Sequence, residues 1–586
     1  RCRDLVRRPT EIFLKEGEKA PPDPKDAHVD LPQDELLKQP VYLPHQPKKD
    51  PRDLKVLDPA CGSGHFLLYC FDLLQVIYEE AYDDPDLGAA LRKDYPAIED
   101  LRRAVPGLIL KHNLHGIDID LRATQIAALA LWLRCQRTYQ ELGLKNGERP
   151  KITRSNIVCA EPMPGETDLL KEFTSTLQPK VLGQLVETVF EEMKLAGEAG
   201  SLLKIEEEIR EAAGKAKFEF IQWKKHQDKA KWSLFPELVK RDQPSIFDFA
   251  DMTDEMFLDR VEDEIVVALR QYAEKASNGR GFRRRLFAED AARGFSFVDV
   301  SSKKYDVVLM NPPFGEATQR LLEYLKKSYP LSKHELAAAF IERASTVSAI
   351  NGLQGAITTR SPFFLKKTAR WRREFFSRYC PAIFLDLGWG VLEAKVETCA
   401  HIFGPADSHA SLFYSVLDKP EKESAVDSLL ERHLEPDRNA FLVDMQTLRS
   451  LPNSPLAYWI PRCISKLFIT LPQFESSEDG RLVRQGIATA DDFRFLRATW
   501  EIPPCLFGQS NADSQDGRGW IRLVKGGEFS EFFSDVHLLV DWLHEGRAIK
   551  DHVLSQYPYL GDNAGFVVKN TDWCFLPGFT WSDRGD

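Results

Sequence analysis

The sequence has few cysteines and no long apolar run, and both absences narrow the classes of protein it can be. Its ten cysteines are scattered over 586 residues, without the paired spacing that marks a zinc site or a redox dithiol. We therefore expect no bound metal, and we expect reduced cysteines in a cytoplasmic protein. No apolar stretch reaches the length needed to span a membrane, so we expect no membrane association.

Composition and length indicate a folded protein of more than one domain. Hydrophobic residues make up 43% and charged residues 28% of the chain, which is the balance of a globular protein. A chain of 586 residues is too long for one ordinary core, so two or three domains are expected. The net charge of −11 excludes a uniformly basic nucleic-acid binder but permits a locally basic groove. Because the sequence begins with Arg1, without an initiator methionine or a signal peptide, we expect it to be part of a longer protein.

Short apolar runs alternate with longer amphipathic stretches in two parts of the chain. This alternation of strands and helices predicts an α/β fold built on a parallel sheet. The expected elements are 54–57, 66–80, 113–117, 123–133 and 156–159 in the first part, and 305–310, 335–349 and 356–359 in the second. Between the two parts, apolar residues recur at helical spacing and predict a helical insertion with its own small core. These residues are Phe257, Val261, Ile265, Ala268 and Tyr272.

Changes of pattern divide the chain into five expected regions. The first is rich in proline and charge, which predicts irregular backbone, and the last is dense in tryptophan, glycine and proline, which indicates a separate domain. We expect that last domain to be α+β. The regions are a lead-in (1–52), the first half of an α/β core (53–164), a mainly helical insertion (165–300), the second half of the core (301–404) and a C-terminal domain that is expected to be incomplete (405–586).

The most informative motif is Asn311-Pro312-Pro313-Phe314, which directly follows the predicted strand 305–310. The prolines stop the strand and remove backbone donors, so the Asn311 side chain and the Pro312 carbonyl can both act as hydrogen-bond acceptors. Such a pair suits a planar amino group, and Phe314 offers a flat face on which an aromatic ring can stack. The motif fits a nucleobase held by its exocyclic amine. The alternative is a proline-stopped strand followed by a simple turn.

A glycine-bearing turn follows the predicted strand 54–57 and leads into a helix. Gly62 and Gly64 would let the backbone approach a ligand closely, and Asp58 could accept a hydrogen bond from a ligand ammonium group. The turn lacks the lysine and hydroxyl residue of a phosphate loop, and it lacks the three glycines of the dinucleotide fingerprint. The turn therefore favours a nucleoside ligand without a phosphate.

Two acids, Asp118 and Asp120, come directly after the predicted strand 113–117. An acid at the carboxyl end of the second strand of a parallel sheet is well placed to bind ribose hydroxyls. Either acid could instead cap the next helix, and we expect Asp120 to be the cap. Asp118 is therefore the candidate ribose ligand.

Together these motifs resemble those of gamma-class DNA adenine methyltransferases, which use S-adenosyl-L-methionine. The segment 58–64 looks like their cofactor loop, and Asn311-Pro312-Pro313-Phe314 resembles their catalytic motif. The resemblance implies a Rossmann-like methyltransferase fold, no metal, and catalytic roles for Asn311, Pro312, Pro313 and Phe314. It implies that the cofactor is bound by Asp58, Pro59, Ala60, Cys61, Gly62, Gly64, Asp118, Ile119 and Glu161.

The resemblance continues beyond these motifs. Segments 336–343, 355–363 and 386–398 look like later motifs of the same fold, the last forming a terminal hairpin. The C-terminal region resembles the target-recognition domains of type IIG restriction-modification enzymes, and more closely those of bacteriophage-exclusion (BREX) methyltransferases related to phage growth limitation. The matching residues are 485–489, Asp491, Arg494, Phe495, Trp520 and 525–527. The sequence departs from this pattern at Ala490, where a glycine is expected.

The resemblance implies that the protein methylates the N6 amine of a flipped adenine in double-stranded DNA, for self-marking in a phage-defence or restriction-modification system. Other proteins of such a system are expected partners. One alternative is a bifunctional type IIG endonuclease-methyltransferase whose nuclease domain lies outside this sequence. Another is a non-catalytic DNA-binding sensor or scaffold. The residues present contain no nuclease motif, and no motif for the cysteine nucleophile of cytosine ring-carbon methylases.

Basic clusters are candidates for contacts with the DNA backbone, although solvated helix faces produce similar runs. One cluster consists of Arg280, Arg283, Arg284 and Arg285, and another surrounds Trp371. In the C-terminal domain, Arg494 is the candidate for base reading, with a salt bridge inside its loop as the alternative. The residues expected to bind DNA are Lys366, Lys367, Arg370, Arg372, Arg494 and Lys525.

Overall fold

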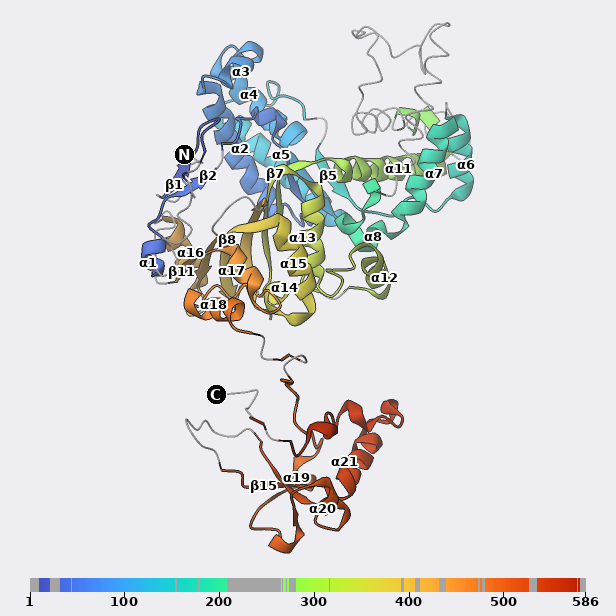
Figure 1. Ribbon diagram of the computed structural model, residues 1–586. Coiled ribbons are helices and arrows are strands. Elements are labelled where there is room, and N and C mark those ends of the chain that lie inside the picture. The colour runs from blue at the N-terminus through green and yellow to red at the C-terminus, as the bar shows by residue number, and fades with distance from the viewer. Residues whose placement is uncertain are drawn as a thin grey trace. The chain divides into compact units, whose positions relative to one another are not determined.

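The computed structural model of the chain forms two compact units, Arg1–Thr470 and Leu471–Asp586 (Figure 1). The residues that it describes are 10–19, 21, 32–43, 45–152, 155–177, 180–207, 265, 267–269, 271–272, 281–315, 317–391, 395–405, 411–431, 439–472, 475–476, 480–525, 535–576 and 578–579. Within these ranges, no helix combines the length and the apolar character needed to cross a membrane.

A nine-stranded sheet forms the centre of the first unit, in the order β11-β10-β8-β9-β7-β6-β3-β4-β5. The neighbours β5, β4, β3, β6 and β7 are parallel, as the alternation of strands and helices predicts. β9 runs antiparallel to both β7 and β8, and the described residues 386–391 and 395–398 lie at the predicted hairpin between β8 and β9. The strands are β3 (Val56–Asp58), β4 (Leu114–Asp118), β5 (Asn156–Cys159), β6 (Tyr305–Met310), β7 (Ser348–Thr359), β8 (Tyr379–Gly388), β9 (Thr398–Pro405), β10 (Ser411–Ser415) and β11 (Ala440–Val443).

The order in which strands are added to the sheet reverses between β3 and β6. After β3 the chain adds β4 and β5 on one side, and it then returns to add β6 and β7 on the other. Leu57 of β3 pairs with Val308 of β6, so these parallel strands end side by side at the same edge. Ligands of open α/β sheets bind outside the carboxyl ends of the strands at such a reversal. The loops after β3 and β6 are therefore where a ligand is expected.

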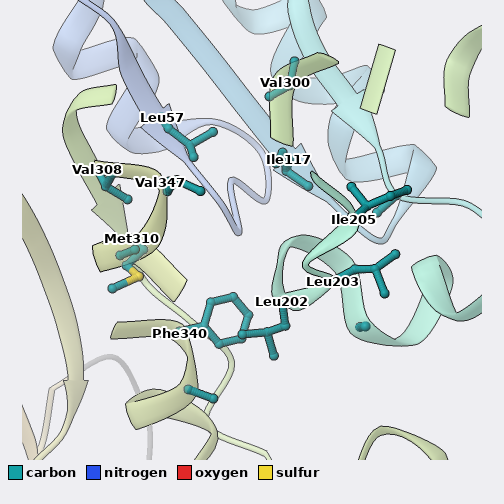
Figure 2. Packing of buried hydrophobic residues seen from close by; sticks show 14 of the residues in the cluster. Leu57, Ile117, Leu202, Leu203, Ile205, Val300, Val308, Met310, Phe340 and Val347 are labelled. Atoms are coloured by element: carbon teal, nitrogen blue, oxygen red, sulfur yellow. The ribbon is translucent and has the colours of Figure 1, made fainter. Parts of the chain in front are cut away.

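Helices cover both faces of the sheet, because successive residues of a strand point to opposite sides. Val56 belongs to an apolar core shared with α2, α4 and α5, whereas the adjacent Leu57 belongs to a core shared with α11 and α13. Figure 2 shows residues of this second core, including Leu57 and Val308 from the neighbouring strands. The predicted α/β class is thus confirmed. The helices are α1 (Gln33–Leu36), α2 (His65–Asp83), α3 (Gly88–Asp94), α4 (Ile98–Leu108), α5 (Leu121–Glu141), α6 (Thr167–Thr176), α7 (Lys180–Glu192), α8 (Ala196–Ala199), α11 (Gly281–Ser302), α12 (Gln319–Ser328), α13 (Leu336–Val347), α14 (Ser361–Phe364), α15 (Ala369–Arg378), α16 (Lys422–Glu431), α17 (Met445–Ser450) and α18 (Arg462–Thr470).

The predicted core elements occur in their expected order, with boundaries that differ by a few residues. The predicted strands 156–159 and 305–310 match β5 and β6. The predicted helix 335–349 ends at Val347, and β7 begins at once with Ser348, well before the predicted strand 356–359. The first four residues of β7 are half-buried or exposed, so they lack the apolar pattern by which a buried strand is found.

The insertion is helical in its described parts, but the prediction of a separate small core was wrong. Its helices α6, α7 and α11 bury apolar side chains in the same cluster as Leu57 and Ile117 of the sheet. Ile265 and Tyr272 also belong to this cluster, whereas Phe257 and Val261 lie outside the described residues. The insertion therefore extends the main core.

The expected domain boundary at 404/405 was also wrong. β10 pairs with β8, and β11 pairs with β10, so residues 411–443 add two strands to the central sheet. Leu448 and Tyr458 pack in the main core as well. The first compact unit ends at Thr470. The lead-in is less irregular than predicted, because β1 (Glu11–Phe13) pairs with β2 (Val41–Leu43) and Leu36 packs with Leu412 of β10.

The second unit contains a four-stranded sheet in the order β12-β15-β14-β13 and helices packed on it. Phe495, Trp542 and Ile549 form the centre of its own core. This mixture of strands and helices matches the predicted α+β character of the C-terminal region. Its elements are α19 (Asp492–Phe495), β12 (Leu496–Ala498), β13 (Phe507–Gly508), α20 (Asn511–Gln515), β14 (Trp520–Leu523), β15 (Leu538–Asp541) and α21 (Leu543–Gln556).

Candidate functional site

Asp58 ends β3 and is almost completely buried, with 1% of its surface exposed. Its Oδ1 accepts a hydrogen bond from the Ala60 amide at 3.1 Å. Burial raises the pKa of the Asp58 carboxyl to about 7, and the nearby Asp118 carboxylate raises it as well. A ligand ammonium group beside Asp58 would favour the ionised carboxylate, which fits the role expected from the sequence.

The two glycines of the following turn have different structural tasks. Gly62 and Gly64 have φ angles of +51° and +86°, in the left-handed region that favours glycine. A Cβ placed on Gly62 would meet no atom within 4 Å, so open space adjoins the loop there. A Cβ placed on Gly64 would lie 3.1 Å from the Cβ of Ala127 in α5. Gly62 thus leaves room for a ligand, and Gly64 allows α2 and α5 to pack closely.

Asp118 ends β4, and its side chain reaches the loop after β3. Its Oδ2 accepts a hydrogen bond from the Gly62 amide at 2.8 Å, and its Oδ1 accepts one from the Asp120 amide at 2.9 Å. The Asp120 side chain accepts a hydrogen bond from the Arg122 amide at the start of α5, which confirms that Asp120 is a helix cap. Asp118 is half-buried and the neighbouring Ile119 is exposed, so both border the surface at this edge.

Glu161 lies one strand further, just after β5. Asp118 pairs with Cys159 in the sheet, and the Ala160 amide donates a hydrogen bond to the Asp118 carbonyl at 2.8 Å. Burial and the adjacent Glu161 carboxylate raise the pKa of the Cys159 thiol to about 12. Glu161 therefore lies at the same sheet edge as the other predicted cofactor residues. Cys61 is buried too, and burial raises the pKa of its thiol, so it remains protonated and packs as an apolar residue.

The motif Asn311-Pro312-Pro313-Phe314 begins where β6 ends. Asn311 is exposed, Pro312 is buried and Phe314 is half-buried. Among the described residues, none forms a hydrogen bond with the Asn311 side chain. Asn311 therefore presents an amide without a hydrogen-bond partner among the described residues, beyond the end of β6.

The strand register brings the two motifs together. Leu57 pairs with Val308, so Ala60 and Asn311 each lie three residues beyond a paired position. Neighbouring strands are about 4.8 Å apart, and both loops leave the sheet at the same edge. The predicted cofactor residues and the predicted catalytic residues thus lie around one reversal point of the sheet.

Sequence reasoning missed Ser201, which borders the same loop. Its buried hydroxyl donates a hydrogen bond to the Pro59 carbonyl at 2.7 Å. Ser201 is separated from Pro59 by 142 residues, and no local pattern marks it. Only the folding of the insertion onto the core brings the two together.

The structure corrects the assignment of Arg372 as a DNA contact. Arg372 is fully buried, and its guanidinium donates hydrogen bonds to five protein oxygens. These are the carbonyls of Pro362 (2.7 Å), Leu365 (2.8 Å), Asn453 (2.8 Å) and Ser454 (3.0 Å) and the hydroxyl of Thr368 (2.8 Å). Arg372 joins the 453–454 turn to α14 and cannot reach a phosphate.

The neighbouring basic residues are on the surface. Lys366 and Arg370 are exposed, and Lys367 forms an ion pair with Glu335 at 2.7 Å. The Lys367 side chain is exposed and the Glu335 side chain is half-buried. Three of the four basic residues expected to bind DNA near Trp371 thus have surface positions.

The arginine cluster of the insertion is paired with acids. Arg283 lies 3.8 Å from Asp168, and Arg284 forms an ion pair with Glu172. Arg285 pairs with Glu289 at 2.9 Å along α11, and Arg280 lies outside the described residues. These ion pairs are typical of a solvated helix face, which explains the run of three arginines.

In the second unit, Arg494 and Lys525 are exposed. The Arg494 guanidinium lies 3.1 Å from Nδ1 of His552, and Lys525 forms an ion pair with Asp492. Ala490 has a φ of +59°, which explains why glycine is expected at this position. The predicted Gly526 and Gly527 lie outside the described residues.

Two family models match the chain. The Eco57I restriction-modification methylase family matches residues 112–388, and the DNA-methyltransferase domain of MmeI matches residues 46–161. Together they include every predicted cofactor and catalytic residue.

Curated relatives are similar over most of the chain. An adenine-specific methyltransferase BrxX of Escherichia coli O9:H4 (strain HS) is 24% identical over 546 residues, covering 91% of this chain and 38% of that protein. An adenine-specific methyltransferase PglX of Lacticaseibacillus casei (strain Zhang) is 24% identical over 526 residues, covering 86% of this chain and 37% of that protein. The chain thus spans less than two fifths of the length of these relatives.

Among solved structures, the type IIL restriction-modification enzyme MmeI in complex with DNA is 14% identical, with a TM-score of 0.34 over 89% of this chain and 51% of that chain. The family models and curated relatives confirm the resemblance to DNA methyltransferases of restriction-modification and BREX type. The chain has an α/β methyltransferase fold.

Proposed function

We propose that this chain is the catalytic and target-recognising part of a DNA adenine N6-methyltransferase that uses S-adenosyl-L-methionine. The observation that carries the proposal is the meeting of two loops, residues 58–64 and 311–314, at the reversal point of the sheet. The first suits a nucleoside with an ammonium group, and the second suits a planar amine. The names of the BrxX and PglX relatives support adenine as the base.

The residues around the loop fit this cofactor. Asp58 supplies a buried carboxylate for the amino-acid ammonium, and the open space beside Gly62 admits the ligand. Asp118 has a carboxylate at the position that binds ribose in parallel α/β sheets. Glu161 and the exposed Ile119 border the place expected for the adenine ring. When bound, this cofactor supplies an electrophilic methyl group on a sulfonium.

Asn311 and Pro312 prepare the target amine. The adenine amine is a poor nucleophile because its lone pair is delocalised into the ring. Hydrogen bonds from the amine to the Asn311 side-chain oxygen and the Pro312 carbonyl favour a pyramidal nitrogen with a localised lone pair. Phe314 offers a face on which the flipped base can stack. Catalysis then rests mainly on positioning and on these two acceptors.

Double-stranded DNA is the proposed partner, and the second unit is proposed to recognise the target sequence. A base inside the duplex hides its amine, so it must be extruded into the site. Lys366, Lys367 and Arg370 are proposed phosphate contacts of the first unit, and Arg494 and Lys525 are proposed contacts of the second. Self-marking in a phage-defence or restriction-modification system, together with other proteins of that system, is the proposed biological role.

A transfer assay tests the reaction. Purified protein is incubated with duplex DNA and cofactor carrying a tritiated methyl group, and hydrolysed DNA is analysed for N6-methyladenine and N4-methylcytosine. Labelled N6-methyladenine with the wild type, and much less with Asn311→Ala, is expected. Absence of transfer by a wild type that binds DNA would support the scaffold alternative. Cleavage of unmethylated DNA would support a bifunctional nuclease.

A further inference from the structure

A short segment of the insertion, residues 200–206, crosses the site beside the loop after β3; we call it the strap. It begins with the turn at Gly200–Leu202 that follows α8. Ser201 is 3% exposed, and its hydroxyl donates to the Pro59 carbonyl at 2.7 Å. The strap therefore contacts the proposed cofactor loop through a buried hydrogen bond.

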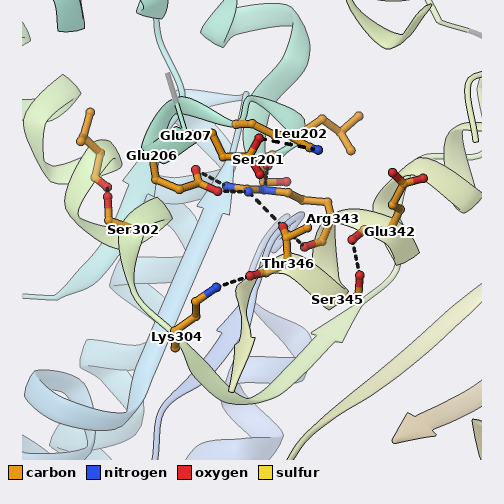
Figure 3. A network of polar contacts seen from close by, with 12 residues as sticks. Ser201, Leu202, Glu206, Glu207, Ser302, Lys304, Glu342, Arg343, Ser345 and Thr346 are labelled. Atoms are coloured by element: carbon orange, nitrogen blue, oxygen red, sulfur yellow. Dashed lines mark hydrogen bonds and ion pairs between the residues drawn. The ribbon is translucent and has the colours of Figure 1, made fainter. Parts of the chain in front are cut away.

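A buried arginine of α13 holds the strap in place (Figure 3). Arg343 is 2% exposed, and its Nε donates to the Ser201 carbonyl at 2.8 Å. Both terminal nitrogens of its guanidinium donate to the Glu206 carboxylate, one of them at 2.9 Å. Such a bidentate ion pair fixes the orientation of the two side chains as well as the distance between them. Arg343 thus binds the strap at two points, Ser201 and Glu206.

Further contacts fix the strap between these points. The Tyr329 hydroxyl donates to the Leu202 carbonyl at 2.7 Å, and the Lys204 amide donates to the Tyr324 hydroxyl at 2.9 Å. Leu202 and Leu203 are buried in the main core (Figure 2). The strap is therefore rigidly attached to the side of the unit formed by α12 and α13.

The same region also contacts the other loops of the site. A Cβ placed on Gly200 would lie 2.9 Å from Cγ2 of Ile119, so the strap passes close to the loop after β4. Glu198, just before the strap, accepts hydrogen bonds from Thr318 at 2.6 Å and Arg320 at 2.7 Å. These two residues follow the motif at 311–314. The strap region thus connects the loops after β3, β4 and β6.

Ser201 acts on the peptide group that orients Asp58. The Pro59 carbonyl and the Ala60 amide belong to one planar peptide group. Ser201 binds its oxygen, and Asp58 Oδ1 accepts a hydrogen bond from its N–H at 3.1 Å. Turning this peptide would move both partners, so the Ser201 hydroxyl fixes the plane that holds the Asp58 carboxylate.

We propose that Ser201 is a positioning residue for cofactor binding, and that Arg343 and Glu206 position Ser201. The proposal rests on the proposed function, because it assigns the cofactor ammonium to Asp58. Loss of the hydroxyl leaves the Pro59 carbonyl without a donor and lets the peptide turn. By the usual cost of such a loss, cofactor affinity should fall about 5- to 100-fold. The turnover number at saturating cofactor should change little, because Ser201 does not contact the target amine.

Calorimetric titration with S-adenosyl-L-methionine, without DNA, tests the proposal. Ser201→Ala and Glu206→Gln are compared with the wild type and with Ser302→Ala, which removes a hydroxyl that bonds within α11 to the Val298 carbonyl at 2.7 Å. Weaker binding by the first two variants, wild-type binding by the third, and an increased KM for the cofactor with kcat within about threefold of the wild type are expected. Thermal melts show whether each variant is folded.

A double-variant cycle separates positioning from general destabilisation. If Ser201 acts through Asp58, Ser201→Ala should weaken binding less in an Asp58→Asn background than in the wild type. Equal losses in both backgrounds, or unchanged affinity in folded Ser201→Ala, would overturn the proposal and leave the proposed function standing. Absence of cofactor binding by the wild type would overturn both.

Discussion

The Gly62 amide donates a hydrogen bond to the Asp118 carboxylate at 2.8 Å, which joins the loop after β3 to the end of β4. The second oxygen of the same carboxylate accepts the Asp120 amide at 2.9 Å. Asp118 therefore has a structural task besides its proposed contact with ribose. It holds in place the glycine turn on which the proposed cofactor would lie.

We expect Asp118→Asn to weaken both the fold of the loop and cofactor binding. The amide has one acceptor oxygen, so its NH2 group would face one of the two backbone amides. An unpaired donor costs about 1 to 3 kcal/mol when fully buried, and we expect less here because Asp118 and Gly62 are half-buried. Thermal melts and cofactor titration measure the two effects separately. Asp120→Asn is the control, because asparagine remains a good helix cap there.

Asp58→Asn should stabilise the cofactor-free protein above pH 7 while weakening cofactor binding. The pKa of Asp58 is about 7 in the fold and about 3.9 in an unfolded chain. The wild type therefore loses stability as pH rises from about 4 to 7, and the loss is constant above that. The variant lacks this loss, so the difference between the two pKa values predicts that it is more stable by roughly 4 kcal/mol at pH 8 and similar at pH 4.

Denaturant melts at both pH values measure this difference. Wild-type cofactor affinity should rise with pH through about 7, as Asp58 ionises and attracts the ammonium group. A wild type whose stability and affinity do not change between pH 5 and 8 would contradict the prediction.

Asn311→Ala should reduce methyl transfer without affecting stability. The side chain is exposed and has no hydrogen-bond partner among the described residues, so its removal should change the free energy of unfolding by less than about 0.5 kcal/mol. Loss of an acceptor for the target amine costs about 1 to 3 kcal/mol, or roughly 5- to 150-fold in rate. Single-turnover rates and melts of the same preparation test both parts. A large loss of stability would show that Asn311 is structural.

Arg372→Met should reduce the stability of the fold, whereas Arg370→Ala should change only the binding of DNA. Arg372 is buried with five hydrogen bonds, so its replacement leaves several carbonyls unpaired and should destabilise the fold by about 3 kcal/mol or more. Arg370 is exposed, and if it contacts a phosphate its loss should reduce the salt dependence of DNA binding by about one counterion. Melts and DNA titrations at several salt concentrations distinguish the two. An unchanged salt dependence would remove Arg370 from the interface.

Ala490→Gly should stabilise the second unit. Ala490 has a φ of +59°, where a Cβ costs about 1 kcal/mol or more and glycine costs little. Allowing for the greater freedom of glycine in the unfolded chain, we expect a gain of about 0.5 kcal/mol. Ala512→Gly at an exposed position of helix α20 is the matched control, and it should destabilise by up to about 1 kcal/mol. Tryptophan fluorescence during urea unfolding reports on both.

The structural features that depend on short segments could be predicted from the sequence. Apolar runs ended by Pro312 or by the turn at Gly62 identify strands that leave the sheet at one edge, and the loop after each strand contains the proposed chemistry. The cap role of Asp120 also follows from local preference. The sheet connects these segments in the predicted order because parallel strands need helices between them.

The missed features depend on contacts between distant segments. Arg372 lies in a run of surface residues and is buried only because the 453–454 turn folds over it. Ser201 meets Pro59 only after the insertion packs on the core. β10 and β11 were assigned to the C-terminal domain from the sequence, yet β10 pairs with β8 and β11 pairs with β10, so both strands belong to the first unit.

β10 pairs with β8 from Leu412–Ser415 to Ile383–Asp386, and β11 covers the outer side of β10. A chain cut after β9 would leave the outer side of β8 unpaired, with its backbone groups and Ile383 available to other chains. Such strand edges promote aggregation. Exchange of the second unit, the proposed recognition domain, between relatives should therefore join the chains after Thr470, beyond the strands that close this edge.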